Sequence, residues 1–356
     1  MKIIRIRSSL RSVPLKKSYT IAYNTFSSVD LVLLEVELAN GIVGYGSASP
    51  AEEVVGETPR QTAKHLDSDM IQQLVGRDIR HFQQLIYEVR QHFPLYPGTQ
   101  AAIDIALHDA FGKFLGIPVV EWYGQKIKAL LTSVTIGIKD VAVTLAEAEE
   151  YRRMGFRVLK VKTGIELEED IERVSKLFER FGRSMIIRVD ANQGYTLVQL
   201  KNFLQATQSF GIELVEQPLP VGSEQELLQL DPYWRGKMTG DESIKDASAA
   251  LRWAAGNQPF GIYNIKLMKC GGLSGAFSIA QIAAAAGIHL FWGCNDESTI
   301  SITAALHAAY ANENTRYLDL DGNFDLQEDL MAGGFRLDDG YMYIGTGAGF
   351  GLIPIS

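Results

Sequence analysis

The sequence predicts an α/β protein: a (β/α)7β barrel of the TIM type with an N-terminal α+β capping domain that the C-terminal tail completes. Two observations lead to this prediction. From residue 133 onward, eight short β-branched runs recur, all but the last followed by an amphipathic stretch, and the middle runs end 25 to 28 residues apart. The first 125 residues do not have this period.

The repeating unit has the length of one strand, one helix and two short loops. Parallel strands need helical crossovers, and eight such units close into a barrel of about the expected size. An open, doubly wound sheet is the second architecture that this alternation allows. The expected barrel strands are residues 133–138, 158–162, 186–190, 212–216, 237–241, 262–267, 288–294 and 316–321.

The N-terminal module has a different pattern, with three strand-like runs followed by three helix-like stretches. The strands are expected at residues 1–13, 30–38 and 42–47, and the helices at 59–75, 79–91 and 100–115. The glycine-rich C-terminal segment has no helical periodicity, so we expect it to return and pack on the N-terminal module. The expected domains are the cap at 1–125, the barrel at 126–321 and the returning segment at 322–356.

The composition limits the classes of partner. The chain has 356 residues, 34 basic and 42 acidic, and a net charge of -8 with no basic stripe, which argues against nucleic acid or an anionic membrane. We therefore expect a small-molecule partner, and allow for a homo-oligomer. Two cysteines, Cys270 and Cys294, are too few for a disulfide framework, and no signal-like segment precedes them, so a cytoplasmic location is expected.

Three acidic residues end consecutive expected strands: Asp190, Glu216 and Asp241. In a barrel these ends meet at one rim, so the three carboxylates would face the same bowl. Their mutual repulsion favours a hard dication with oxygen ligands, usually Mg²⁺. Any one of them alone could equally be a helix N-cap or a loop acid. Three at constant spacing favour the metal site.

Lysines occupy two of the remaining strands. Lys160 and Lys162 lie two apart on one strand and so share a face, whereas Lys266 ends a strand almost across the barrel. Neighbouring cations and a low dielectric lower a lysine pKa toward that of a base. A carbon acid held between Lys162 and Lys266 could lose a proton to one and gain a proton from the other, which inverts the stereocentre. A single lysine at a strand end is usually a snorkelling surface side chain.

These motifs together resemble the enolase superfamily, in its muconate-lactonizing-enzyme subgroup, over nearly the whole chain. The motifs are Lys160-x-Lys162, Asp190-Ala191-Asn192, Glu216-Gln217-Pro218, Asp241-Glu242-Ser243 and Lys266. The resemblance implies the cap-and-barrel fold, Mg²⁺ bound by the three acids, and proton transfer by Lys162 and Lys266. The histidine of the mandelate racemase subgroup is missing from the seventh strand, which reads Phe291-Trp292-Gly293-Cys294.

The eighth strand ends in an Asp-x-Asp pair, Asp319 and Asp321, which resembles the dipeptide epimerases. In those enzymes the pair binds the α-ammonium group of the substrate, and two carboxylates on one strand face suit a cation. The pair could instead cap a loop or neutralise nearby lysines. The same resemblance implies that Thr135 and Asp296 contact the substrate, which would be epimerised at the α-carbon of its C-terminal residue. Lys160, closer to the barrel floor than Lys162, is placed to contact a substrate carboxylate.

Two lid loops, expected at residues 19–28 and 50–57, would contribute to side-chain specificity. The first has no cationic residue between 21 and 26, which argues against an Ala-Glu substrate. Glu52, Glu53 and Asp296 favour a cationic or polar second residue, although the two glutamates could simply be solvated charges. We therefore predict faster epimerisation of dipeptides ending in Lys or Arg.

Three other interpretations use the same residues. One is o-succinylbenzoate synthesis or N-acylamino acid racemisation, whose substrates have no free ammonium group. Another is a Schiff-base lyase with Lys162 as the nucleophile, which would not need a metal. The last is a non-catalytic, metal-stabilised protein that only binds a small ligand at the barrel mouth.

Overall fold

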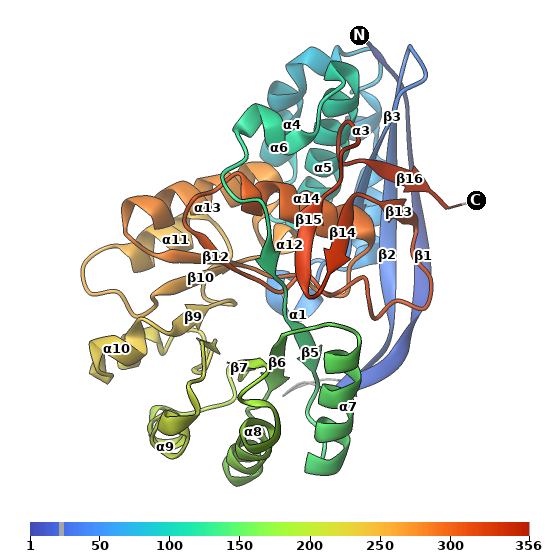
Figure 1. The fold of residues 1–356 in the computed structure, drawn as a ribbon. Coiled ribbons are helices and arrows are strands. Elements are labelled where there is room, and N and C mark those ends of the chain that lie inside the picture. The colour runs from blue at the N-terminus through green and yellow to red at the C-terminus, as the bar shows by residue number, and fades with distance from the viewer. Residues whose placement is uncertain (21–24, 356) are drawn as a thin grey trace.

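The computed structural model of this chain describes residues 1–20 and 25–355. Its eight-stranded parallel sheet runs in strict sequence order from β5 to β12 (Figure 1). The two end strands also meet, because Thr132 pairs in parallel with Leu318 and the Ser133 backbone N–H donates to the Leu318 carbonyl at 3.0 Å. The predicted barrel is confirmed, and the sequential strand order excludes a doubly wound sheet.

Each expected barrel run overlaps a strand. The strands are β5 Val134–Ile136, β6 Val158–Lys162, β7 Ile186–Asp190, β8 Val215–Glu216, β9 Met238–Gly240, β10 Ile262–Ile265, β11 His289–Trp292 and β12 Thr315–Leu318. The connecting helices are α7 Val141–Arg153, α8 Leu167–Phe181, α9 Leu197–Thr207, α10 Pro232–Arg235, α11 Ala247–Ala254, α12 Leu267–Cys270, α13 Leu273–Ala285 and α14 Thr299–Tyr310, with 3-10 turns at Gln208–Phe210 and Glu224–Gln229.

Helix α8 illustrates how the sequence forms the outer layer of the barrel. Val174, Leu177 and Phe181 are buried at helical spacing and so form one apolar stripe, while three acids occupy the first turn. Acidic side chains at a helix N-terminus are favoured by the helix dipole. Strand β6, by contrast, is buried along its whole length, as expected for a parallel strand covered on both sides.

The N-terminal module consists of an antiparallel three-stranded sheet in the order β1-β2-β3 with helices against it. Its elements are β1 Ile3–Thr20, β2 Thr25–Leu38, β3 Val43–Ala48, α1 Glu52–Val55, α2 Pro59–Leu66, α3 Asp69–Gln72, a 3-10 turn Ile79–His81, α4 Phe82–His92, α5 Pro97–Leu115 and α6 Val119–Tyr123. The short strand β4 Leu130–Leu131 follows this module and pairs antiparallel with residues 341–342. Three details differ from expectation. The strand expected at 1–13 extends to Thr20, the helix expected at 59–75 is divided at residues 67–68, and the lid expected as a loop at 50–57 contains α1.

Helix α5 packs on strand β3 at unusually close range. A Cβ atom at Gly44 or Gly46 would collide with the backbone of this helix at Ala106 or Ala102, so these two positions have room only for glycine. Helix α5 is buried over most of its length, with Ile103, Ile105 and Leu107 all in the core. The capping module therefore has a rigid centre.

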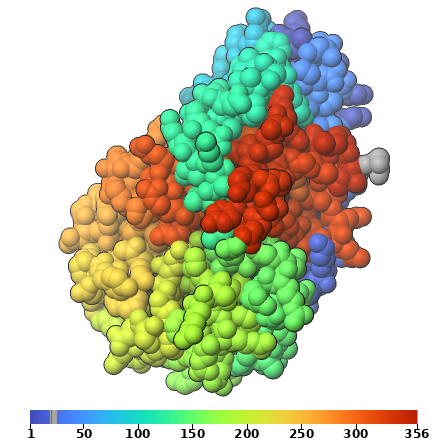
Figure 2. Space-filling view, viewed as in Figure 1, coloured from blue at the N-terminus to red at the C-terminus, as the bar shows by residue number. Residues whose placement is uncertain are grey.

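The C-terminal segment returns to the capping module. It forms β13 Met331–Gly333, β14 Phe335–Asp338, β15 Tyr341–Ile344 and β16 Leu352–Pro354. Leu326 packs against Val13 and Leu15 of β1, and the Phe350 N–H donates to Asp109 Oδ1 of α5 at 2.8 Å. Figure 2 shows this segment, in red, between the blue and cyan capping module and the green and yellow part of the barrel.

No helix in residues 1–20 or 25–355 has both the length and the apolar character needed to cross a membrane.

A buried histidine on α14 makes the free energy of unfolding depend on pH. His307 is 1% exposed, its Nδ1 accepts a hydrogen bond from the Val120 N–H at 3.1 Å, and burial lowers its pKa to about 3. The unfolded chain binds a proton here near pH 6.5 and the folded chain does not, so the free energy of unfolding must fall as pH drops below about 6.5.

We expect this histidine to remove about 1.4 kcal/mol of stability between pH 7.5 and 5.5. Urea unfolding of the parent and of His307→Gln at both pH values measures this effect, since other titrating groups cancel in the comparison. An equal loss in the two proteins would show that His307 does not contribute.

Candidate active site

Three buried carboxylates lie at the C-terminal rim of neighbouring strands. Asp190 ends β7, Glu216 ends β8, and Asp241 follows the last residue of β9. Each of the three residues is 0 to 2% exposed, and Asp190 is the register partner of Glu216. The three side chains lie together at one rim because the carboxyl ends of all the strands of a parallel barrel meet there.

The turns after these strands have an unusual backbone. Asn192 and Gln217 have φ angles of 41° and 32°, in the left-handed region that non-glycine residues seldom adopt. The Gln217 side chain braces the next turn, because its Oε1 accepts from the Asp241 N–H at 2.9 Å and from the Ser243 N–H at 3.1 Å. Strained residues of this kind are found where a site is held in a fixed shape.

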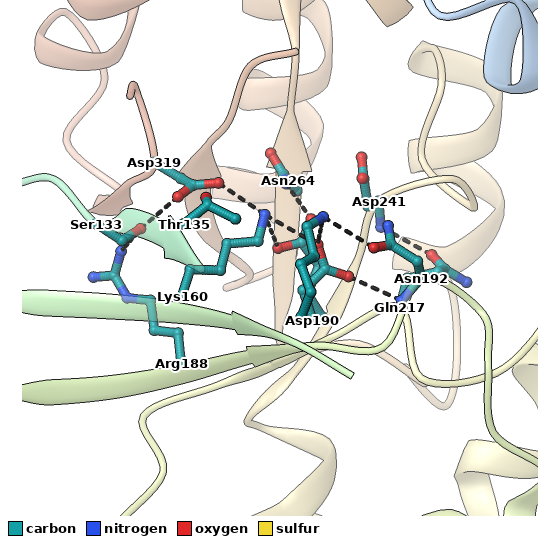
Figure 3. Close-up of polar contacts among 12 residues, drawn as sticks. Ser133, Thr135, Lys160, Arg188, Asp190, Asn192, Gln217, Asp241, Asn264 and Asp319 are labelled. Carbon is teal, nitrogen blue, oxygen red and sulfur yellow. Dashed lines mark hydrogen bonds and ion pairs between the residues drawn. The ribbon is translucent and has the colours of Figure 1, made fainter. Parts of the chain in front are cut away.

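Lys160 and Lys162 project from β6 into the same cavity, and Figure 3 shows Lys160 among the carboxylates. Lys160 Nζ lies 3.1 Å from Asp190, 2.9 Å from Glu216 and 2.8 Å from Asp319. Lys162 Nζ lies 2.7 Å from Asp190 Oδ2 and 2.9 Å from Asn192 Oδ1. The side chain of Lys160 is therefore a cation surrounded by carboxylates. Burial lowers the pKa of Lys160, but the charges of Asp319, Glu216 and Asp190 outweigh burial and raise this pKa well above the ordinary value.

Lys266 faces this pair from the other wall. It directly follows β10, which is four strands from β6 in the eight-stranded order, and its Nζ lies 2.9 Å from Asp241 Oδ2. Burial lowers the pKa of Lys266, but Asp241 outweighs it and the net shift is upward. Both Lys162 and Lys266 line the same cavity, of about 420 Å³.

The chemistry of these carboxylates suits a hard dication. Burial and then Asp190 raise the pKa of Glu216 to about 8, whereas in Asp190 the opposing effect of burial is overcome by Lys162 and Lys160, which lower the pKa to about 2. Glu216 Oε2 is buried and has no well-directed hydrogen bond among the described residues, although Lys160 Nζ lies 2.9 Å from it. Within residues 1–20 and 25–355 no three acidic, histidine or cysteine side chains are clustered as closely as metal ligands, because lysines separate these acids. All three side chains are buried and offer only carboxylate oxygens, which are the ligands that Mg²⁺ prefers, so the set fits Mg²⁺.

The Asp319 and Asp321 pair lies at the seam between β12 and β5. Asp319 Oδ1 accepts from the Ser133 hydroxyl at 2.6 Å, and its Oδ2 accepts from Lys160 at 2.8 Å. Asp321 Oδ2 accepts from the Thr135 backbone N–H at 2.7 Å, and burial followed by the charge of Asp319 raises the pKa of Asp321 to about 7. Asp319 thus neutralises a lysine, as the alternative interpretation expected, and still faces the cavity.

The remaining predicted residues lie around the cavity mouth. Thr135, Glu52, Glu53 and Asp296 all line it, with Glu52 and Glu53 exposed at α1. Residues 21–24 of the first expected lid lie outside the described residues. Ten acidic side chains but only five lysines line the described part of the cavity, so acidic groups outnumber basic groups there.

The second lid is attached to the barrel at two points. Lys245, in the turn after β9, donates from Nζ to the Val54 carbonyl at the end of α1. Asn295, in the turn after β11, donates from Nδ2 to the Ser49 carbonyl at 2.9 Å. These contacts hold Glu52 and Glu53 over the cavity.

Sequence reasoning missed several residues of the site. Lys269, buried on α12, donates to Asp241 Oδ1 and, at 3.0 Å, to the Asn264 carbonyl, while Asn264 Nδ2 donates to Glu216 Oε1 at 2.7 Å. Lys269 lies in the short helix that follows Lys266, and the alternation of the preceding strand gave no signal for it. Arg188 lies two residues before Asp190 on β7, and side chains two apart on a strand share a face. This spacing could have indicated that Arg188 points into the barrel.

Comparison with known proteins gives a consistent family match. Residues 4–124 match the N-terminal domain of the mandelate racemase / muconate lactonizing enzyme family, and residues 143–354 match the enolase C-terminal domain-like family. An L-Lys-D/L-Arg epimerase of Methylococcus capsulatus is 46% identical over 99% of both chains, and one of Desulforapulum autotrophicum is 44% identical over 99% of both. The crystal structure of the dipeptide epimerase from Methylococcus capsulatus, complexed with Mg and L-Arg-D-Lys, matches with a TM-score of 0.97 at 46% identity, covering 99% of this chain and 100% of that one.

Proposed function

We infer that this chain, which belongs to the mandelate racemase / muconate lactonizing enzyme family of the enolase superfamily, is a Mg²⁺-dependent dipeptide epimerase. As an isomerase it inverts the α-carbon of the C-terminal residue of a dipeptide. The observation that carries this proposal is the placement of two lysine ammonium groups, Lys162 and Lys266, on opposite walls of one cavity beside three buried carboxylates.

Lys162 and Lys266 are the proposed acid and base. One lysine removes the α-proton from one face of the substrate, and the other delivers a proton to the opposite face. Each ammonium or amine needs to be within hydrogen-bond reach of the α-carbon proton, which a cavity lined by both permits. Asp190, Glu216 and Asp241 would hold Mg²⁺, which supplies charge neutralisation at the substrate carboxylate as the α-proton is lost.

The seam aspartates are the proposed ammonium site. Asp319 and Asp321 would accept hydrogen bonds from the α-ammonium group of the dipeptide, while Thr135 and Lys160 would contact its backbone or carboxylate. A carboxylate has about four lone-pair positions, so the two protein donors on Asp319 leave room for a substrate donor.

The proposed substrates carry a cationic second residue. The acidic excess around the mouth, to which Glu52, Glu53 and Asp296 contribute, favours a lysine or arginine side chain over a glutamate. The two relatives that are named L-Lys-D/L-Arg epimerases support the same preference. We place the reaction in the cytoplasm, supported by two free thiols, Cys270 and Cys294, and we assign residues 1–125 and 322–356 to the cap and 126–321 to the barrel.

The test is exchange of the α-proton for solvent deuterium, followed by mass spectrometry over a panel of L,L-dipeptides with Mg²⁺ present. We expect L-Lys-L-Arg to exchange at least about ten times faster than L-Ala-L-Glu, and Asp296→Asn to lower kcat/KM for L-Lys-L-Arg more than for L-Ala-L-Ala. If Ala-Glu is the best substrate, the proposed preference is wrong. Complete absence of exchange would favour the binding-protein interpretation, and exchange that persists in EDTA would favour a Schiff-base lyase.

A further inference from the structure

A chain of hydrogen bonds links Arg188 through Ser133 to Asp319 (Figure 3). Glu213 Oε2 accepts from Arg188 Nε at 2.6 Å, and Arg188 Nη1 donates to the Ser133 hydroxyl oxygen at 3.1 Å. The Ser133 hydroxyl in turn lies 2.6 Å from Asp319 Oδ1 and 3.2 Å from the Leu318 carbonyl. It has one proton to donate, and the shorter, charge-assisted contact to Asp319 is the favoured one.

Arg188 is fixed independently of this serine. Its guanidinium also donates to the Leu318 carbonyl at 2.6 Å and lies 5.3 Å from the ring centroids of both Phe291 and Tyr317. A residue only 3% exposed with this many contacts has one orientation. The Ser133 oxygen must therefore accept from Arg188, which directs its proton toward Asp319.

The two aspartates of the seam are held in different ways. Asp321 takes its support from a backbone N–H, that of Thr135, which no side-chain substitution removes. Asp319 depends on side chains, Ser133 on one oxygen and Lys160 on the other. Lys160 is shared with Asp190 and Glu216, whereas Ser133 has no other carboxylate contact among the described residues. Ser133 therefore determines how Asp319 is oriented.

We propose that Ser133, polarised by Arg188, is a positioning residue that orients Asp319 toward the α-ammonium group of the dipeptide. This inference rests on the proposed function. It assigns to two residues outside the cavity lining a role in recognising the amino end of the substrate. The buried Ser133 hydroxyl holds the Asp319 carboxylate in one orientation before the substrate binds. Binding then costs less conformational entropy, because the substrate does not have to fix this side chain.

Substitution of the hydroxyl tests the proposal. We expect Ser133→Ala to lower kcat/KM for α-deuterium exchange of L-Lys-L-Arg by about 10- to 100-fold, mainly through KM, since one hydrogen bond to a charged group is lost. 6-Aminohexanoyl-L-arginine lacks only the α-ammonium group, so its kcat/KM, or its Ki as an inhibitor if exchange is slow, should change less than about threefold. Ser133→Cys, with a weaker donor, should fall between.

Thr132→Val is the matched control. Thr132 lies in the same seam, is fully buried, and its Oγ1 accepts from the Leu320 N–H at 2.9 Å without touching Asp319. It should lower the thermal unfolding midpoint but leave the ratio of the two substrates unchanged. Equal losses on both substrates in Ser133→Ala, or no loss on the dipeptide, would overturn the positioning role. Absence of exchange in the parent protein on every dipeptide would instead overturn the proposed function, and this inference with it.

Discussion

Lys162→Ala and Lys266→Ala are each expected to lower the rate of dipeptide epimerisation by at least about 10³-fold, because each removes one of the two proposed proton-transfer groups, and inversion needs both. The variants should differ in their residual chemistry. The lysine that remains can still remove the proton from the epimer it faces and return a solvent deuteron to the same side. Each variant should therefore exchange one epimer without inversion, and the two variants should exchange opposite epimers.

Mass spectrometry combined with chiral chromatography separates exchange from inversion. Lys176→Ala is a suitable control, because Lys176 is an exposed lysine on α8 paired with Glu179 at 2.8 Å and remote from the cavity. It should behave like the parent. If both site variants retained exchange of the same epimer, the two lysines would have to serve the same face of the substrate, and the two-wall arrangement would have no role in inversion.

Asp241→Asn is expected to abolish Mg²⁺ binding and to lower α-proton exchange by at least about 10³-fold, since the metal term contributes several kcal/mol to stabilising the developing charge. Asp241 is 2% exposed and its two oxygens face Lys266 and Lys269, so the amide would leave two buried ammonium groups without their carboxylate. Calorimetric titration with Mg²⁺ measures the loss of binding without any turnover.

A thermal scan gives a second readout. At a free Mg²⁺ concentration 100 times the dissociation constant, binding stabilises the folded parent protein by about 2.7 kcal/mol, and the variant should lose this increment. Asp246→Asn makes the same chemical change at an exposed N-cap nearby and should keep Mg²⁺ binding. Unchanged Mg²⁺ affinity in Asp241→Asn would remove this carboxylate from the proposed metal ligands.

Much of the barrel could be predicted because each strand and helix is marked by the pattern of its own residues. The end of β6 at Lys162 and the end of β7 at Asp190 coincide with the ends of β-branched runs, since parallel strands are buried on both faces and need apolar residues throughout. Strand β8 is only Val215–Glu216, shorter than the expected run 212–216. The length of β8 is set by which of its residues form backbone hydrogen bonds with the neighbouring strands, and not by the β-propensity of residues 212–216.

The parts that could not be predicted depend on contacts between distant segments. Strand β1 continues through Pro14 to Thr20, well past the expected end at 13. Residues 325–327 of the tail provide backbone partners for residues 14–16, and strand β2 pairs with residues 19–20. Similarly, nothing in the alternation around Ser133 shows that its hydroxyl meets Asp319, 186 residues away. The acids and lysines were predictable as types at strand ends, whereas the network that pairs them requires the closed barrel.

The return of the tail has a consequence for biosynthesis. The backbone of residues 14–16 bonds to that of residues 325–327, so the roof beside the cavity is built from both ends of the chain. A ribosome therefore has to add residues 325–327 before this roof can be assembled, although the central barrel units emerge much earlier. Nascent chains halted before residue 325 would have the lysines and carboxylates of the rim but an unsealed reaction chamber, and so should be inactive.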